Sequence, residues 1–90
     1  MVSYKILWKK SAAKELKDLD KQIIPKIIST VENLSNNPFP SGAKKLIASD
    51  FTYRIRFGDY RIIYSVFRTR LVVEIIRVGH RKDIYRKSNQ

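Results

Sequence analysis

The chain has 90 residues, no Cys, one His, and 19 Lys and Arg against 8 Asp and Glu, which gives a formal net charge of +11. A chain this short forms one domain, here residues 1–90, and without Cys it has no disulfide, thiol nucleophile or Cys-based zinc site. One His cannot form a cluster of His ligands, so we expect no metal and no cofactor, and the excess of positive charge predicts a polyanionic partner.

The N-terminal half predicts one strand and two helices. Residues 2–8 are rich in strand formers, and Ser11 is suited to cap a helix over residues 11–20. A second helix is expected over residues 21–34, because its apolar residues recur at helical spacing and Pro25 falls in the first turn. No early apolar run is long enough for a signal peptide or a membrane span, so we expect a soluble cytoplasmic protein without membrane contact.

The C-terminal half changes to the period-two pattern of strands. Residues 36–42 are rich in turn formers, and the segments KLIAS, FTYRIRF, YRIIYSVF and LVVEIIRV then follow one another as a meander. The order of strand, helix, helix and three or four further strands predicts an α+β fold. In this fold the helical hairpin packs on one face of a mostly antiparallel sheet.

The arginines are concentrated in the predicted sheet. All eight lie in residues 51–90, whereas nine of the eleven lysines lie in residues 1–50, where we interpret them as mostly solvating. Gly58 and Asp59 favour a two-residue turn. Arg56 then faces Arg61, and the alternation of strand side chains places both on one face with Arg54. Like charges across a strand pair cost up to about 1 kcal/mol, so the cluster indicates an anion site rather than an ordinary polar sheet surface.

A second polar cluster, residues 79–87, follows the last predicted strand. Gly79 lets the backbone leave the sheet, and Arg81 adds positive charge. His80 can exchange a proton near neutral pH, and Tyr85 adds a phenol. The alternative interpretation is a basic tail that contacts phosphates non-specifically, with a bystander histidine.

The run YRIRFGDYRIIYSV, residues 53–66, followed by RVGHRKDIYR, residues 77–86, resembles the RelE side of the RelE/ParE superfamily of toxins from type II toxin–antitoxin pairs. Chain length and element order fit as well. RelE-like members are ribosome-dependent endoribonucleases that cut mRNA in the ribosomal A site without a metal, whereas ParE-like members inhibit DNA gyrase. The resemblance implies that the site contains Arg54, Arg56, Arg61, Arg81 and Tyr85.

The sequence departs from the RelE pattern at Arg54 and Arg56, where well-known RelE-like members carry lysine. Arginine does not lose its proton in proteins, so neither residue can be the general base. We expect the sheet arginines to grip the scissile phosphate while the ribose 2′-OH attacks it, with Arg81 near the leaving oxygen. His80 or Tyr85 is left to move the proton, and the ordinary pKa of each favours His80 slightly.

The resemblance also implies partners. The expected inhibitor is a RelB-like antitoxin, small, acidic in part and partly disordered when free, whose helix or strand covers the basic face. The expected substrate is mRNA on the ribosome. Two other functions stay open: gyrase inhibition of the ParE type without nuclease activity, and binding of nucleic acid by an inactive relative or a simple binding module.

Overall fold

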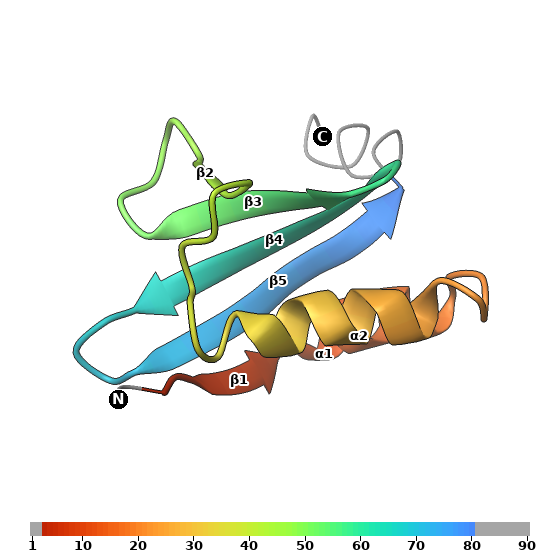
Figure 1. Ribbon diagram of the computed structural model, residues 1–90, viewed down its shortest axis with the longest axis horizontal. Coiled ribbons are helices and arrows are strands. Elements are labelled where there is room, and N and C mark those ends of the chain that lie inside the picture. The colour runs from red at the N-terminus through yellow and green to blue at the C-terminus, as the bar shows by residue number, and fades with distance from the viewer. Residues whose placement is uncertain (1–2, 81–90) are drawn as a thin grey trace.

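The computed structural model describes residues 3–80. Its elements, in chain order, are β1 (Lys5–Trp8), α1 (Lys10–Lys17), α2 (Ile24–Asn33), β2 (Lys44–Lys45), β3 (Thr52–Phe57), β4 (Tyr60–Phe67) and β5 (Val72–His80). They form one five-stranded sheet and two helices (Figure 1), which confirms the expected α+β fold. None of the helices in this part of the chain is long and apolar enough to cross a membrane.

The sheet has the strand order β1-β5-β4-β3-β2. The strands from β2 to β5 pair antiparallel in chain order, whereas β1 pairs in parallel with β5. A parallel pair needs a crossover, and the helical hairpin lies within the connection that provides it. The first and last strands of this sheet are therefore neighbours, at the edge opposite β2 (Figure 1).

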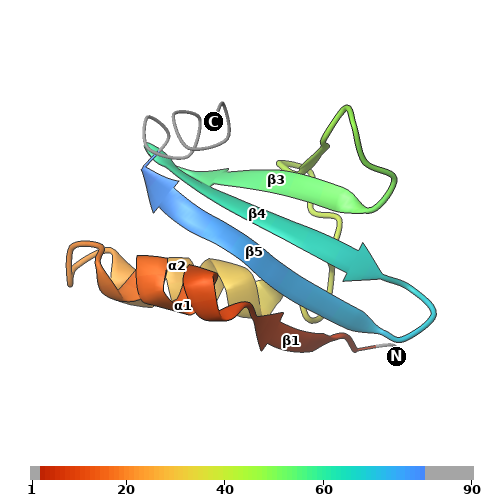
Figure 2. The ribbon, with the colours of Figure 1, turned by 180° about the vertical axis from the view of Figure 1, so that it is seen from behind.

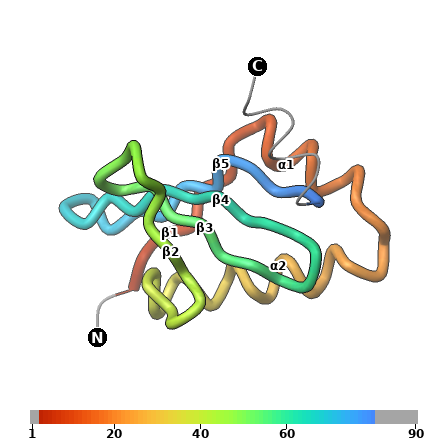
Figure 3. Tube along the Cα trace, turned by 90° about the horizontal axis from the view of Figure 1, so that it is seen from above, coloured from red at the N-terminus to blue at the C-terminus, as the bar shows by residue number. Residues whose placement is uncertain are grey.

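Both helices contribute to a single hydrophobic core on one face of the sheet. Ile27 and Val31 of α2 are buried there, with Ala12 of α1. From the sheet, Ile62 and Tyr64 of β4 belong to the same cluster. Seen from above, the connection between the helices, residues 18–23, lies beyond the end of the β3–β4 hairpin (Figure 3). Because the core lies between the helices and one face of the sheet, the opposite face of β3 and β4 lies outside the core.

Helix α1 follows β1 directly, on the β5 side of the sheet (Figure 2). Strand β1 pairs with β5 only as far as Ile75, and Glu15 of α1 contacts the part of β5 beyond it. One Glu15 carboxylate oxygen, Oε1, accepts a hydrogen bond from the backbone N–H of Val78 at 3.1 Å. Strand β1 is too short to reach Val78, so the Glu15 carboxylate accepts the hydrogen bond from this backbone N–H at the edge of the sheet.

Two boundaries of the helical half differ from the sequence expectation. Helix α1 begins at Lys10 after the cap residue Lys9, which makes no side-chain capping bond, so Ser11 is inside the helix and is not the cap. The reason is that the Lys9 N–H still donates to the Ile75 carbonyl at 3.0 Å, and the chain enters the helix straight from the sheet. Helix α2 begins at Ile24, later than expected, and keeps Pro25 in its first turn.

The segment KLIAS is not the strand that its composition predicts. Lys44 and Lys45 pair with β3, and the Leu46 N–H donates to the Thr52 carbonyl at 2.9 Å in the same register. The chain then turns, with the Ser49 N–H donating to the Leu46 carbonyl at 3.3 Å. Ile47 in this turn is fully exposed. An apolar side chain with no facing strand gains nothing from an extended conformation, so local strand propensity does not decide here.

Strand β5 carries a bulge that its sequence pattern does not reveal. Ile63 pairs with Arg77 and Tyr64 with Ile75, which leaves Ile76 as the extra residue between them. Residues three apart in a regular strand point to opposite faces, whereas here Ile75 and Val78 are both buried in the core. The bulge thus lets both halves of β5 face the helices.

Candidate active site

The β3–β4 hairpin has the register expected from the sequence. Gly58 has a φ of +57°, a conformation that costs glycine little because it has no Cβ, and strand pairing resumes directly after Asp59. Arg56 is paired with Arg61, and Arg54 lies two residues earlier on β3. These three side chains lie on the sheet face opposite the core, and we call them the arginine face.

A groove of about 390 Å³ adjoins the arginine face. It is lined by Lys44, Lys45, Leu46, Ile47, Arg54, Arg61 and Ile63. Four of these seven residues are cations and none is an acid. Arg61 is only 4% exposed, whereas Arg56, its cross-strand neighbour, is exposed. The groove therefore offers a charged wall, partly shielded from water, in which a phosphate is held more strongly than at an open surface.

Lys44 and Lys45 are groove residues that sequence reasoning missed. Lysine on a small domain is usually a solvating residue, and the sequence alone predicts that role for this pair. The register of β2 places Lys44 directly opposite Arg54 on the sheet. A local signal existed, because two adjacent lysines precede the arginine hairpin, but only the strand pairing brings them beside it.

Gly79 has a different role from the one expected. It does not mark the exit from the sheet, because β5 continues through Gly79 to His80. Gly79 is paired with Arg61 and is buried. Since it has no side chain, it leaves room beside the Arg61 side chain on this face.

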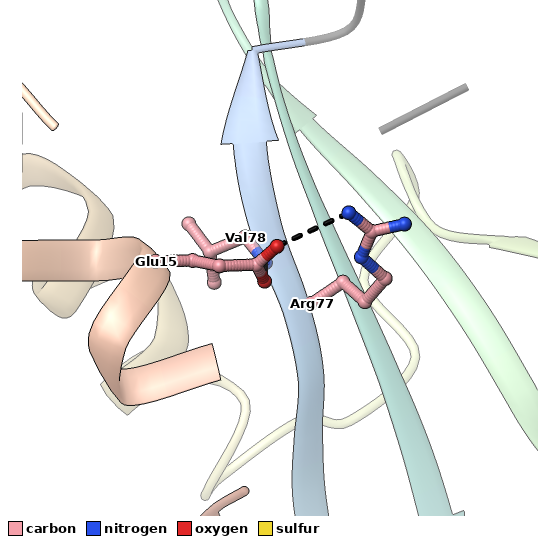
Figure 4. A network of polar contacts seen from close by, with 3 residues as sticks. All are labelled: Glu15, Arg77 and Val78. Atoms are coloured by element: carbon pink, nitrogen blue, oxygen red, sulfur yellow. Dashed lines mark hydrogen bonds and ion pairs between the residues drawn. The ribbon is translucent and has the colours of Figure 1, made fainter. Parts of the chain in front are cut away.

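Arg77 is near the arginine face in the sheet but is engaged by a helix. Its Nη2 lies 3.1 Å from Oε2 of Glu15, in an ion pair whose two side chains are each 20% exposed (Figure 4). The other Glu15 oxygen is bound to the Val78 N–H. Arg77 therefore ties β5 to α1 and is not part of the candidate site.

His80 lies on the other side of the sheet from the arginines. It pairs with Tyr60, and the two rings meet edge to face with centroids 5.7 Å apart. Tyr60 packs against the hydrophobic core, so His80 is on the core side of β5. The structure thus brings together Arg54, Arg56 and Arg61 of the expected site and separates His80 from them. Residues 81–90, with Arg81 and Tyr85, lie outside the described residues.

Comparisons with known proteins agree with this architecture. The family model of the ParE toxin of the type II toxin–antitoxin system parDE matches residues 6–85. Toxin RelG of Mycobacterium tuberculosis is 29% identical over 85 residues, which cover 93% of this chain and 98% of that protein.

Two solved structures are similar over most of their length. One is the RelBE2 toxin–antitoxin complex of Mycobacterium tuberculosis, whose matched chain has a TM-score of 0.80 and 28% identity, with 89% of this chain and 93% of that chain covered. The other is the archaeal RelE–RelB complex from Pyrococcus horikoshii OT3, with a TM-score of 0.78, 30% identity, and 88% and 96% covered. The fold and these matches define a small toxin of the type II toxin–antitoxin class. Within that class the chain belongs to the RelE/ParE family and is RelE-like.

Proposed function

We propose that the protein is a ribosome-dependent endoribonuclease that cuts mRNA in the ribosomal A site. The supporting observation is the arginine face beside a groove lined by four cations and no acid. A planar guanidinium can hold two phosphate oxygens at once, so this surface suits the RNA backbone. The cytoplasm, where mRNA is translated, is the place of action that the proposal implies.

The proposed reaction is attack of a ribose 2′-OH on the adjacent phosphorus. The new O–P bond closes a 2′,3′-cyclic phosphate as the bond to the 5′ oxygen breaks. A base takes the 2′-OH proton, and the leaving oxygen receives a proton. The guanidiniums of Arg54, Arg56 and Arg61 stabilise the extra negative charge on the pentavalent phosphorane, and this scheme needs no metal. These arginines stay protonated, so the base is another group.

In this proposal, residues after β5 carry out the proton transfers. His80 is beside Tyr60 on the core side of the sheet, so we assign the base to Tyr85, although the ordinary pKa of each group favours His80. Nearby cations stabilise a phenolate and lower the pKa of a tyrosine. Arg81 is assigned to the leaving 5′ oxygen.

A RelB-like antitoxin is the proposed inhibitor. The similar solved structures from Mycobacterium tuberculosis and Pyrococcus horikoshii are complexes of a toxin with its antitoxin. The +11 charge of this chain favours a partner with acidic segments. An antitoxin that covered the arginine face would block access of RNA to it.

The cleavage proposal is tested with purified toxin, a defined mRNA and programmed ribosomes. Wild-type protein is expected to cut the mRNA on ribosomes and to leave the naked mRNA largely intact. Arg61→Gln is expected to cut at least about 100-fold more slowly, because it removes one charged donor from the transition state. Lys26→Gln, at an exposed position of α2, is the matched control and is expected to cut like wild type.

Two results would overturn parts of this proposal. Equal cutting by folded Arg61→Gln and wild type would refute the site. Intact mRNA on ribosomes with wild-type toxin would refute the function.

Gyrase inhibition is the second candidate, because the matching family model is that of a ParE toxin. In that case purified protein inhibits supercoiling by DNA gyrase, and Arg61→Gln inhibits as well as wild type. The same two proteins tested in both assays separate the candidates.

A further inference from the structure

A second surface of mixed aromatic and cationic character lies at the end of β4 away from the Gly58 turn. The rings of Phe51 and Phe67 have centroids 5.3 Å apart, and the Arg70 guanidinium lies 4.5 Å from the centroid of the Phe67 ring. Phe51 is 47% exposed, and neither ring belongs to the hydrophobic core. We call Phe51, Phe67 and Arg70 the aromatic end.

The backbone that presents Phe51 is held by hydrogen bonds on both sides. The Phe51 N–H donates to Ser49 Oγ at 3.2 Å, and the Thr52 N–H donates to the same oxygen at 3.1 Å. The Phe51 carbonyl accepts a hydrogen bond from the Val66 N–H at 2.9 Å. An exposed ring on a fixed backbone loses little conformational freedom when a ligand stacks on it.

Phe67 lies on the same side of the sheet as the arginine face, and the Phe51 ring packs against the Phe67 ring. Alternation along β4 places positions 61, 63, 65 and 67 on this face. Arg61 and Phe67 are six residues apart on this strand, which corresponds to about 20 Å. Between them, the hydroxyls of Thr52 and Ser65 are hydrogen-bonded to each other at 2.9 Å. This side of the sheet thus carries the arginine face at one end and the aromatic end at the other.

We propose that the aromatic end stacks a base of the same RNA strand whose scissile phosphate lies on the arginine face, with Arg70 beside the neighbouring phosphate. The inference rests on the proposed function and adds a substrate-positioning subsite. Proteins that hold single-stranded RNA combine cations with exposed aromatic rings, because every base has a face that can stack. Arg68 of the same turn is not part of this surface, because its guanidinium lies 4.7 Å from the centroid of the Phe39 ring, which packs against the core. An RNA strand is favoured over a peptide because this surface continues the arginine face.

The first test compares two RNAs of different reach, both made with 2′-O-methyl ribose so that neither can be cut. A dodecanucleotide spans the distance between the two ends of the face, and a trinucleotide does not. Phe51→Leu keeps the apolar character and removes the aromatic ring. It is expected to weaken binding of the dodecanucleotide about tenfold, measured by fluorescence anisotropy, and to leave trinucleotide binding unchanged. Leu7→Ala removes a comparably exposed apolar side chain, 41% exposed on β1, and is expected to bind both RNAs like wild type.

The second readout reports on stacking directly. Phe51→Trp in a Trp8→Phe background places the only indole of the chain at the aromatic end. Its emission is expected to be quenched by the dodecanucleotide and not by the trinucleotide. Unchanged emission, wild-type affinity of Phe51→Leu, or a wild-type protein that does not bind the dodecanucleotide would each overturn the inference.

The outcomes also separate this inference from the proposed function. If mRNA is cut on ribosomes while Phe51→Leu binds RNA like wild type, only the stacking subsite is wrong. If binding of the dodecanucleotide depends on Phe51 while mRNA on ribosomes stays intact, the cleavage proposal is wrong and the subsite stands. If Phe51→Leu weakens binding of an antitoxin and not of RNA, the aromatic end is a protein contact and the inference fails.

Discussion

Two polar residues of β4, Arg61 and Tyr64, are both nearly buried and have different roles. Arg61 lines the groove on the arginine face. Tyr64 points to the core side, where its hydroxyl donates to the Pro38 carbonyl at 2.8 Å and its ring stacks on Tyr53. Burial, and to a lesser extent Tyr53, raises the pKa of Tyr64 well above its ordinary value. Tyr64 therefore ties the loop after α2 to the sheet as a neutral group.

Tyr64→Phe is expected to change stability in a way that depends on pH. Near neutral pH it should lose about 1 kcal/mol of unfolding free energy, because a buried hydrogen bond disappears. Above about pH 10 the unfolded tyrosine releases its proton while the folded one keeps it. The unfolded state then binds fewer protons, and this contribution to wild-type stability falls as pH rises. Urea unfolding of both proteins, near neutral pH and at alkaline pH, is expected to show the gap narrowing, and a constant gap would contradict this account.

At the scale of elements, the register of the β3–β4 hairpin could be predicted from sequence. A two-residue turn fixes which residues face each other, and alternation fixes the two faces, so Gly58 and Asp59 were enough to place Arg56 opposite Arg61. The order of strand, helices and sheet followed from the periodicity of the apolar residues. These features depend on local pattern, and the structure confirms them.

Other features depend on contacts between distant segments, and local pattern did not reveal them. The bulge at Ile76 allows apolar residues in both halves of β5 to be buried against the helices. His80 pairs with Tyr60 because β5 continues past Gly79. Lys44 joins the site only through its pairing with Arg54. Arg54, Arg56 and Arg61 are together as expected, and the roles of Arg81 and Tyr85 remain predictions.

The Gly58 turn gives a prediction at this scale. Gly58→Ala is expected to cost about 1 kcal/mol or somewhat more, because a residue with a Cβ is strained at a φ of +57°. Gly42→Ala is the matched control, since Gly42 is exposed and a Cβ there would meet nothing within 4 Å. Urea unfolding should show a loss for Gly58→Ala and little change for Gly42→Ala. If both alanine variants were as stable as wild type, the turn would not depend on glycine.

In the whole molecule, the residues that stabilise the fold and the residues proposed to bind RNA lie on opposite faces of one sheet. The core lies on the face toward the helices, and Glu15 of α1 closes the β5 edge by binding Arg77 and the Val78 N–H. The other face carries the arginine face and the aromatic end. Some substitutions on that face should therefore change RNA binding without unfolding the protein, although Arg61 is buried enough that its variants need a folding control.

The central claim is that the arginine face cuts translated mRNA. Primer extension on cellular mRNAs after brief induction tests it most directly, with wild type, Arg61→Gln, Arg81→Ala and the control Lys26→Gln expressed to equal levels of folded protein. We expect new 5′ ends within coding regions for wild type and Lys26→Gln, and at least about 100-fold fewer for the two arginine variants. No new ends with wild type, or the same ends with Arg61→Gln and Arg81→Ala, would contradict the account.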